Sequence, residues 1–370
     1  MSHLEPYTLT TLLSSTVTLV MGILLFAVSV PRDPGLKNYR ISRWFLTGAY
    51  IILSGFGWLE IFGENDMGEP TIVMVFTLIA ASYQAMLFTF STLTLINVGY
   101  MTRRVVLRNI IPVTILAVVL LTFLFSMPQQ PFYVAFYVMA GLYCLQIVYY
   151  IVLFRGEYRK YRWRFDNFFS GDEYRRLIWI RNAFYMAACV GVIAVVSLFV
   201  NILLYTIFTG AYTLFYIYFA VKFINYVTIF HRIAPVVDTS KETTSRNYSD
   251  NQIIPAAIEC WINTKGFVQQ DITLESLAIE LCTNQSYLSR YINAQFGQNF
   301  KAWINSLRIG EAQRLLDDQH DLSLTEVAEQ SGIPSNSTFY RNFVTVTGMT
   351  PAEYRRQKQS ESKMINEPEN

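Results

Sequence analysis

The sequence has few of the residues from which metal centres, disulfide frameworks and enzyme sites are built. It contains three histidines and four cysteines in 370 residues. Cys144 and Cys189 lie in apolar stretches, whereas Cys260 and Cys282 lie in a polar region, and no two cysteines are close in sequence. This spacing fits neither a zinc site nor a set of disulfides. The apolar stretches also lack paired carboxylates and a nucleophile motif, so we predict no metal, no cofactor and no enzymatic activity.

Charge is scarce as well. Only 15% of the residues are charged and 52% are hydrophobic, whereas about 25% of the residues of an average soluble domain are charged. The small net charge of +2 hides a division of the chain. Residues 1–231 carry 16 basic and 10 acidic side chains, and residues 232–370 carry 13 and 17. The opposite balances indicate that the two parts occupy different environments.

Seven apolar stretches are long enough to cross a membrane. A bilayer core of about 30 Å requires roughly 20 consecutive, mostly apolar residues in a helix. The stretches are 9–30, 44–63, 71–98, 105–126, 132–154, 182–208 and 211–230. Short turns at "SMPQQP" and at "TG" predict that the fourth and fifth spans, and the sixth and seventh, are antiparallel neighbours. We therefore predict a seven-transmembrane-helix domain over residues 1–231.

The basic residues of this domain predict its orientation, because Lys and Arg accumulate in the cytoplasmic loops of membrane proteins. Fifteen of the sixteen lie in the segments 31–43, 99–109 and 155–181, which face one side if the seven spans are correct. The segments that face the other side carry none, and the sixteenth basic residue is Lys222. This pattern predicts a multi-pass protein of the cytoplasmic membrane with its N-terminus outside and every residue after 231 in the cytoplasm.

Some polar side chains fall inside the predicted spans. Such residues are by default candidates for function, although amides there also serve as interhelical hydrogen-bond partners. The candidates for ligand binding or polar pairing are Gln84, Asn97, Gln146, Asn201, Lys222 and Asn225. Lys222, near the middle of the seventh span, either extends toward the cytoplasmic face, pairs with a polar partner or binds an anionic ligand. Glu60, near the outer end of the second span, is expected to reach the membrane interface.

Two further segments are polar. Segment 155–181 interleaves Arg with Tyr, Trp and Phe, a pattern typical of nucleic-acid binding or of contact with anionic lipid headgroups; its juxtamembrane position favours lipid. The same segment could also pass a signal to the domain that follows. Residues 232–252 include "DTSKETTSRNYSDNQ", which is rich in Ser, Thr and Asn and has no apolar periodicity, so we predict a flexible linker.

The polar region after residue 252 contains two similar sets of short amphipathic helices. In each set an alanine is followed after twelve or thirteen residues by an arginine, and after seven more by a glycine. These residues are Ala278, Arg290 and Gly297, and Ala328, Arg341 and Gly348. Helix starts are indicated by Thr273 and by the capping boxes "SLTE" (323–326) and "TPAE" (350–353). Two helix-turn-helix units joined by a linking helix are therefore predicted over residues 253–360, with a disordered tail over 361–370.

This region resembles the DNA-binding domain of the AraC/XylS family of bacterial transcription regulators. The resemblance is carried by "LAIELCTNQSYLSRYINAQFGQNFKAWINSLRIGEAQRLL" and "VAEQSGIPSNSTFYRNFVTVTGMTPAEYRR". The family pattern is matched by Gly332, Phe339, Phe343, Gly348, Thr350, Pro351, Tyr354 and Arg355. Cys282 and Thr283 depart from it, because a turn containing glycine is common there. The resemblance implies double-stranded promoter DNA as a partner, RNA polymerase as a further candidate partner, and activation as the direction of regulation.

The second helix of each unit would enter the major groove, with the outward side chains at its start near the bases. The predicted DNA-binding residues are Gln285, Ser286, Ser289 and Arg290, and Asn336, Ser337, Thr338, Tyr340 and Arg341. Leu288, Ile292, Phe296, Phe339 and Phe343 are expected in the core. Residues 252–360 hold nine basic and eleven acidic residues, so local positive charge is expected from Arg290, Arg341, Arg355 and Arg356.

The sequence thus predicts an all-α protein in which a seven-helix membrane bundle precedes a cytoplasmic DNA-binding domain. The function indicated is a transcription regulator of the bacterial inner membrane that couples a membrane or extracytoplasmic signal to promoter binding, with homodimerisation through the bundle as an option. The alternative is a receptor or transporter-like protein whose helical tail binds a protein partner.

Overall fold

The structure is a computed structural model that describes residues 6–67, 70–126, 129–170, 178–228 and 253–366. Within these ranges all regular secondary structure is helical, apart from one isolated bridge between Phe169 and Thr273. The all-α prediction is therefore confirmed. The chain divides into two compact units: Met1–Tyr161 with Arg176–Lys241, and Arg162–Arg175 with Glu242–Asn370.

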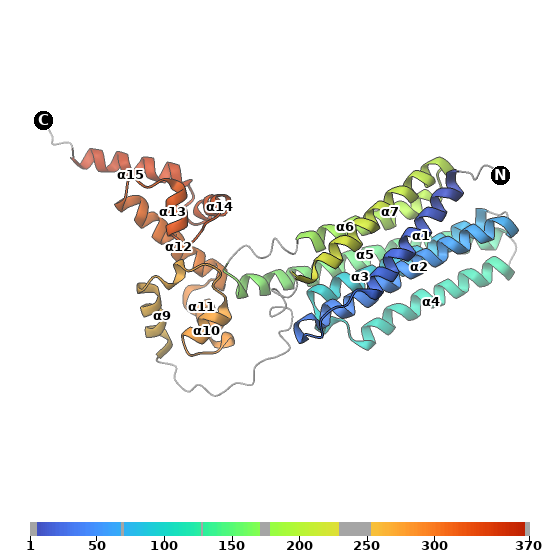
Figure 1. Ribbon diagram of the computed structural model, residues 1–370, viewed down its shortest axis with the longest axis horizontal. Helices are drawn as coiled ribbons and strands as arrows, with labels where there is room; N and C mark the ends of the chain where they lie inside the picture. Colours follow the sequence, from blue (N-terminus) through green and yellow to red (C-terminus); the bar gives the residue numbers. More distant parts are fainter. Residues whose placement is uncertain (1–5, 68–69, 127–128, 171–177, 229–252, 367–370) are drawn as a thin grey trace. The chain divides into compact units, whose positions relative to one another are not determined.

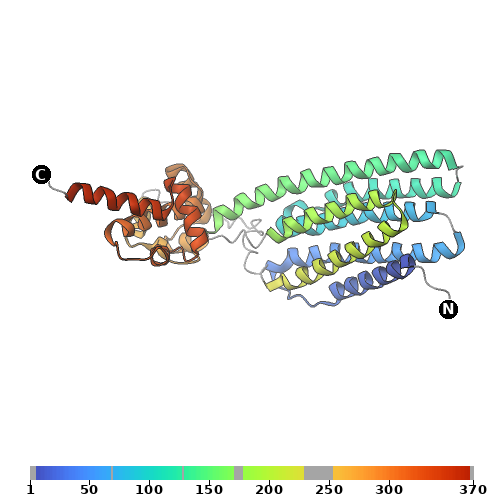
Figure 2. The same cartoon turned by 90° about the horizontal axis from the view of Figure 1, so that it is seen from above.

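The first unit consists of seven long helices that lie side by side (Figures 1 and 2). They are α1 (Pro6–Ala27), α2 (Lys37–Met67), α3 (Pro70–Ile96), α4 (Arg103–Ser126), α5 (Gln129–Phe168), α6 (Ile178–Ser197) and α7 (Ile202–Asn225). Short 3-10 turns precede α2 (Pro34–Leu36) and follow α3 (Val98–Tyr100). Each of the seven helices is long and apolar enough to cross a membrane.

Small and hydroxylated side chains hold the helices of this unit close together. The Ser54 hydroxyl of α2 donates to the Ser15 carbonyl of α1 at 2.8 Å, and the Ser42 hydroxyl donates to the Ser91 carbonyl of α3 at 2.8 Å. A side chain at Gly22 would place its Cβ 3.2 Å from that of Tyr50. Close backbone approach with interhelical hydrogen bonds is typical of helices that associate in a bilayer.

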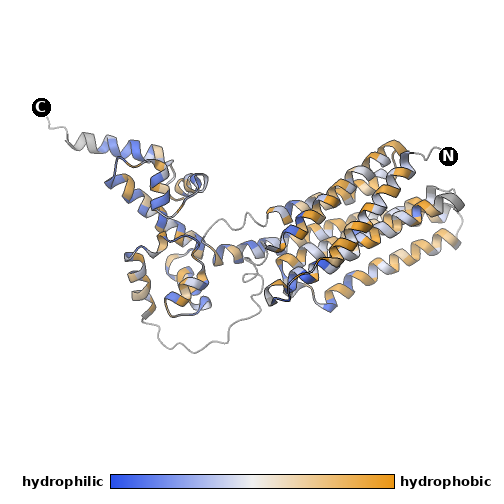
Figure 3. Cartoon of the chain, viewed as in Figure 1, coloured by the Kyte–Doolittle hydropathy of each residue, from blue (hydrophilic) through white to orange (hydrophobic). Residues whose placement is uncertain are grey.

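The exterior of the first unit is apolar. Large hydrophobic side chains are more than 60% exposed on several helices, among them Leu13, Val134, Leu145, Val152 and Leu214. Figure 3 shows hydrophobic residues along the length of all seven helices. An apolar surface this extensive is unfavourable in water. The seven helices are thus compatible with a membrane protein, as the hydropathy of the sequence predicts.

The predicted boundary between the sixth and seventh spans is wrong. We expected a turn at "TG", residues 209–210, but both residues lie inside α7. The break is at 198–201, where the Asn201 side chain accepts a hydrogen bond from the Leu204 amide at 3.0 Å and caps α7. Hydropathy does not reveal this break because Leu198, Phe199 and Val200 are themselves apolar.

The second unit contains the end of α5 and seven further α-helices. These are α9 (Ile253–Asn263), α10 (Leu274–Glu280), α11 (Gln285–Phe296), α12 (Phe300–Asp318), α13 (Leu324–Gln330), α14 (Asn336–Thr347) and α15 (Pro351–Asn366). A 3-10 turn, η4 (Gly266–Val268), follows α9. The predicted linker 232–252 lies outside the described residues. Helix α15 continues to Asn366, into the segment 361–370 for which disorder was expected.

The predicted helix starts are found in this unit. Thr273 caps α10, its hydroxyl accepting from the Ser276 amide at 3.0 Å. In the capping box of α13, the Ser323 amide donates to the Glu326 carboxylate at 2.7 Å and the Glu326 amide donates to the Ser323 hydroxyl at 3.2 Å. The Thr350 amide donates in the same way to Glu353, at 2.8 Å, at the start of α15. Such boxes satisfy amides that have no partner inside the helix.

Helix α12 belongs to two hydrophobic cores. Its first half, with Trp303 and Ile304, packs on α9, α10 and α11. Its second half, with Leu315 and Leu316, packs on α13 and α14. Arg308 lies between the two halves and is only 5% exposed. Its guanidinium donates to the Phe267 and Gln269 carbonyls at 2.8 and 2.7 Å, so η4 is fixed to the middle of α12.

A second close approach joins the two halves of this unit. Gly332, in the turn after α13, has φ +83°, a conformation that residues with a side chain rarely adopt. A Cβ at this position would lie 2.5 Å from the Val268 carbonyl oxygen. Only glycine allows the turn to pack against η4.

Gly332→Ala is therefore expected to lower the free energy of unfolding by about 1–3 kcal/mol. Gly310→Ala is the matched control, because this helical glycine is exposed and has no atom within 4 Å of the added Cβ. It should be neutral or stabilise by up to about 1 kcal/mol. Urea unfolding of residues 242–370, followed by the fluorescence of Trp261 and Trp303, measures both. Equal stability of the two variants would contradict the close packing at Gly332.

Candidate nucleic-acid interface

The two predicted helix-turn-helix units have the same backbone hydrogen bonds in their turns. In the first, the amide of Thr283 donates to the carbonyl of Ala278 at 2.8 Å; in the second, the amide of Ile333 donates to the carbonyl of Ala328 at 2.8 Å. The preceding hydrogen bonds also match. The amide of Leu281 donates to the carbonyl of Leu277 at 2.9 Å, and the amide of Ser331 donates to the carbonyl of Val327 at 3.0 Å. The turns are therefore equivalent at an offset of fifty residues, and α11 and α14 follow them as equivalent second helices.

Cys282 occupies the position that glycine occupies in the second turn. Its φ is +52°, in the left-handed region, and Gly332 stands at the equivalent position. A non-glycine residue held there carries strain of about 1–3 kcal/mol. The departure at "CT" in the sequence thus leaves the geometry of the turn intact and lowers its stability.

The residues of the first helix-turn-helix that are predicted to read DNA lie on the first half of α11. Ser286 and Arg290 are exposed, and Gln285 and Ser289 are half-buried. The Arg290 guanidinium donates to the Ser286 carbonyl at 3.2 Å, which holds this side chain along the surface of the helix.

On α14, the corresponding residues are also at the surface. Asn336, Ser337, Tyr340 and Arg341 are exposed and Thr338 is half-buried. The side-chain amide of Asn336 donates to the Thr325 hydroxyl of α13 at 3.3 Å. This bond joins the start of α14 to the first helix of the same helix-turn-helix. The nine predicted residues therefore form two groups, on α11 and α14 of the second unit, and none of them is buried.

The core prediction for these helices is correct with one exception. Leu288, Ile292, Phe339 and Phe343 are fully buried. Phe296 is 40% exposed and stacks with one face on Trp303, at 5.5 Å between ring centroids. It lies in the last turn of α11, where the helix leaves the core, so periodicity alone overestimates its burial.

Many basic side chains of the second unit are engaged in contacts within the protein. Arg308 is buried, and the Arg355 guanidinium donates to the Leu322 carbonyl at 2.6 Å. The Lys358 ammonium lies 2.9 Å from the Glu361 carboxylate. Arg355 was expected to add positive charge at the interface, but it holds the segment between α12 and α13. Of the four arginines expected to add positive charge, Arg290, Arg341 and Arg356 are exposed.

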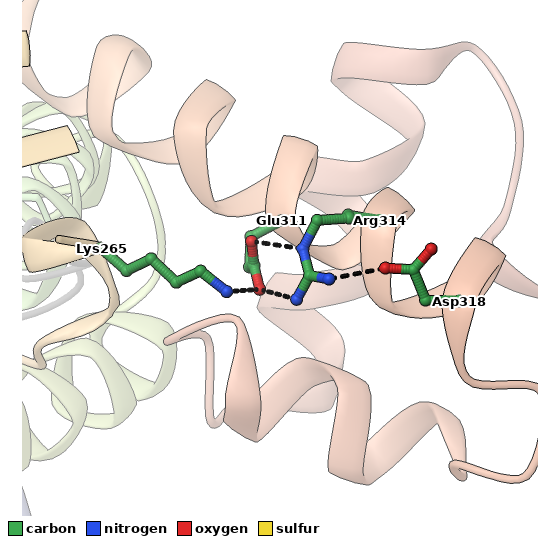
Figure 4. Close-up of polar contacts among 4 residues, drawn as sticks. All are labelled: Lys265, Glu311, Arg314 and Asp318. Atoms are coloured by element: carbon green, nitrogen blue, oxygen red, sulfur yellow. Dashed lines mark hydrogen bonds and ion pairs between the residues drawn. The ribbon is translucent and has the colours of Figure 1, made fainter. Parts of the chain in front are cut away.

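A cluster of charges also fixes η4 to α12 (Figure 4). The Glu311 carboxylate, 9% exposed, accepts hydrogen bonds from Arg314 at 2.8 Å and from Lys265 at 2.8 Å. Arg314 in turn donates to Asp318 at 2.6 Å. Hydrogen bonds from Arg314 and Lys265 hold the pKa of Glu311 below its ordinary value of 4.5. Burial lowers the pKa of Arg308 to about 10, which leaves it charged at neutral pH.

The polar candidates of the first unit do not come together in one site. Lys222 and Asn225 are exposed in the last turn of α7. The placement of Lys222 near mid-span is wrong, because α7 begins and ends earlier than the predicted seventh span. Gln146 on α5 donates to the Ser82 carbonyl of α3 at 3.0 Å, which is the interhelical pairing that the sequence allows. Gln84 is 6% exposed in the interior of the unit.

The expectation for Glu60 was wrong. It is 7% exposed and accepts hydrogen bonds from the hydroxyls of Tyr7 and Tyr205, the latter at 3.3 Å, rather than reaching the interface. The available signal was its position inside an apolar run, where a carboxylate is costly and usually has a function.

Comparisons with known proteins concern the second unit. A family model described as a helix-turn-helix domain matches residues 277–357. The melibiose operon regulatory protein of Escherichia coli (strain K12) is 30% identical over 90 residues, 24% of this chain and 30% of that protein. The uncharacterized HTH-type transcriptional regulator YtdP of Bacillus subtilis (strain 168) is 30% identical over 92 residues, 25% of this chain and 12% of that protein.

Among solved structures, the C-terminal domain of AraT, a response regulator from Geobacillus stearothermophilus, is 33% identical. The match covers 30% of this chain and 88% of that chain, with a TM-score of 0.27. The chain thus spans less than a third of the length of the two curated relatives named above. These similarities concern the two helix-turn-helix units and not the seven-helix unit.

The charge cluster at Glu311 predicts a pH-dependent loss of stability. Because its pKa is lowered in the folded state, the stability it contributes is present above about pH 4.5 and is lost as the pH falls through the lowered value. Glu311→Gln should lower the free energy of unfolding of residues 242–370 by about 1–3 kcal/mol at pH 7. The difference from the native fragment should shrink below pH 4.5. Thermal unfolding at both pH values measures this, with the exposed Glu280→Gln as a control that should be neutral.

Proposed function

Residues 277–357 are a helix-turn-helix domain of the AraC type, and we propose that this chain uses them to regulate transcription from within a membrane. The observation that carries this proposal is the presence of both modules in one polypeptide. Seven apolar helices precede two equivalent helix-turn-helix units with exposed polar side chains at the starts of α11 and α14.

The membrane part of the proposal is supported by the surface of the first unit. The side chains buried between its helices include small and polar residues, whereas its outer face carries large apolar side chains. This distribution suits a solvent of lipid, in which backbone groups must be satisfied within helices. The bilayer, including anionic headgroups next to the basic segments, is the proposed surrounding of this unit.

The topology follows from the loops. With fifteen of sixteen basic residues of 1–231 on one side, the positive-inside rule places the N-terminus outside and the second unit in the cytoplasm. This is the compartment that contains the DNA of a bacterium. The proposed location is therefore the cytoplasmic membrane of a bacterium.

The proposed reading of DNA assigns different tasks to different side chains. In this proposal Arg290 and Arg341 bond guanine, and Gln285 and Asn336 bond adenine, in the major groove. The hydroxyls of the other five predicted residues are suited to phosphates, which fix register. The two helix-turn-helix motifs of the second unit would then contact successive turns of the duplex.

In this proposal, a signal from the membrane reaches these helices through α5. This helix is continuous from Gln129 to Phe168, yet its residues up to Tyr161 belong to the first unit and those from Arg162 to the second. Segment 155–168 is therefore a helical extension of the fifth span and not a loop. We assign to it the role of transmitting movement, which the sequence left open.

Within the second unit the end of α5 is attached to the first helix-turn-helix. Ser170 donates to the Ile272 carbonyl from its amide at 3.2 Å and from its hydroxyl at 2.7 Å. Asp166 lies 3.7 Å from the Lys301 ammonium at the start of α12. Ile272 directly precedes Thr273, the cap of α10. A shift of α5 would thus act on the start of the first helix-turn-helix.

The competing function is a receptor or transporter-like protein whose helical tail binds a protein. The observation that favours it is the charge of residues 252–360, nine basic against eleven acidic, which is weak for DNA binding. Activation and contact with RNA polymerase belong to the main proposal and rest on the family resemblance. Homodimerisation through the seven helices also belongs to it, because linked binding sites strengthen weak modules.

Arg290→Ala and Arg341→Ala are expected to weaken binding of the full-length protein to its promoter roughly 5- to 150-fold, because each would remove a base contact. Gln295→Ala, exposed at the far end of α11, is the control and should leave binding unchanged. Genome-wide crosslinking finds the promoter, and electrophoretic shifts at several salt concentrations measure affinity. No sequence-preferring binding to any genomic fragment, together with a stable protein partner, would favour the competing function.

The route through α5 is tested by breaking the helix. Insertion of three glycines after Tyr161 should abolish the response of a promoter reporter to the signal, while DNA binding by the second unit persists. The same insertion within 238–252 is the matched control and should preserve the response. If the two insertions have equal effects on the reporter, α5 does not carry the signal.

A further inference from the structure

The first unit contains a cavity between α2, α3, α5, α6 and α7 of about 100 Å³. One water molecule needs about 10–15 Å³ in this measure, so an organic molecule of roughly ten non-hydrogen atoms fits. Small residues keep the space open. They include Ala81 on α3 and Ala187, Ala188 and Gly191 on α6.

One end of the cavity is polar and acceptor-rich. The carboxylate of Glu60 accepts a hydrogen bond from the Tyr205 hydroxyl at 3.3 Å, and this hydroxyl lies 3.5 Å from that of Thr77. Tyr7 donates to the same carboxylate. Glu60, Thr77 and Tyr205 all line the cavity. A buried carboxylate held in this way is fixed in position and presents acceptor oxygens.

A further polar side chain of the lining is Gln84, on α3. It is 6% exposed, and its hydrogen-bond neighbour is the hydroxyl of Tyr216, which also lines the cavity. A side-chain amide has two donors and an acceptor oxygen, so one such neighbour leaves capacity for a hydrogen bond to an occupant. Gln84 follows Thr77 by seven residues, which is about 10 Å along a helix.

The lining selects the charge of an occupant. Among the described residues that line it there is one carboxylate and no lysine, arginine or histidine. Its walls include the rings of Phe56, Phe76, Phe208 and Tyr212. Aromatic faces attract cations and the carboxylate repels anions, so a carboxylate or phosphate ligand is disfavoured and an ammonium is favoured. Lys222, once a candidate for anion binding, does not line this cavity.

We propose that this cavity is a binding site for a small organic amine, with its ammonium group at Glu60 and a second polar group at Gln84. The ammonium donates to the Glu60 carboxylate among the aromatic rings. A hydroxyl at the other end of the molecule bonds the Gln84 amide across the apolar middle. A role of such an amine as the signal for the second unit rests on the proposed function. Binding of the amine to the cavity does not depend on that function.

Binding is measured by isothermal titration calorimetry on the full-length protein in detergent. The probes are tyramine, 2-phenylethylamine, 2-phenylethanol and phenylacetate, which share a ring and differ in charge and in the distal hydroxyl. Tyramine is expected to bind most tightly, 2-phenylethylamine less tightly, and phenylacetate not at all. Glu60→Gln should weaken both amines roughly 10- to 100-fold. Gln84→Leu should remove the advantage of tyramine over 2-phenylethylamine.

The matched control is Glu157→Gln, which alters a buried carboxylate of α5 that does not line the cavity and should leave amine binding unchanged. If Glu60→Gln fails to fold, Ala81→Phe fills the cavity without altering the carboxylate and should abolish binding of both amines. Absence of amine binding to the folded native protein overturns the proposal. So does binding of 2-phenylethanol as tight as that of the amines, or amine binding that survives Ala81→Phe. Amine binding without any change in promoter affinity would count against the proposed signalling and leave the site standing.

Discussion

The buried guanidinium of Arg308 is the interaction on which the DNA-binding unit depends. It lies in the middle of α12, between the two hydrophobic cores that this helix supplies, and its two bonds to the carbonyls of η4 satisfy a charge that would otherwise be costly to bury. The Glu311 cluster reinforces the same attachment from the next turn. Since both helix-turn-helix units pack on α12, the relation between α11 and α14 follows from this one helix.

The sequence was sufficient for the all-α class, the two repeated units and most helix starts, because each depends on local chemistry. Capping residues such as Ser323 and periodic apolar positions such as Leu288 act within a few residues of themselves. The sequence was insufficient where tertiary contacts decide. The break before α7 is made by Asn201 within an apolar run, and the burial of Glu60 depends on Tyr205, which is 145 residues away. Gln84 was a candidate on hydropathy, but only the cavity gives it a specific role.

The two units differ in what holds them together, and that difference bears on signalling. The first unit relies on small residues, hydroxyl bonds and aromatic packing around an incompletely filled interior, so occupancy of that interior can alter how its helices pack. The second has two hydrophobic cores that share α12 and a charge cluster on that helix. In the proposed route, a change that begins in the former would reach the latter through α5, whose last residues bond next to the cap of α10. The end of α5 is thereby part of the DNA-binding unit rather than a loop beside it.

The contact between Gly332 and Val268 has a consequence for the nucleic acid. Together with α12 it removes the hinge that two linked helix-turn-helix units would otherwise have, so the protein cannot adjust the separation of α11 and α14 to a straight duplex. Any mismatch with the pitch of B-DNA must then be absorbed by the DNA, through bending or groove compression whose energy depends on base sequence. Base steps between the two contacted segments, which no side chain touches, would thereby help to select the promoter.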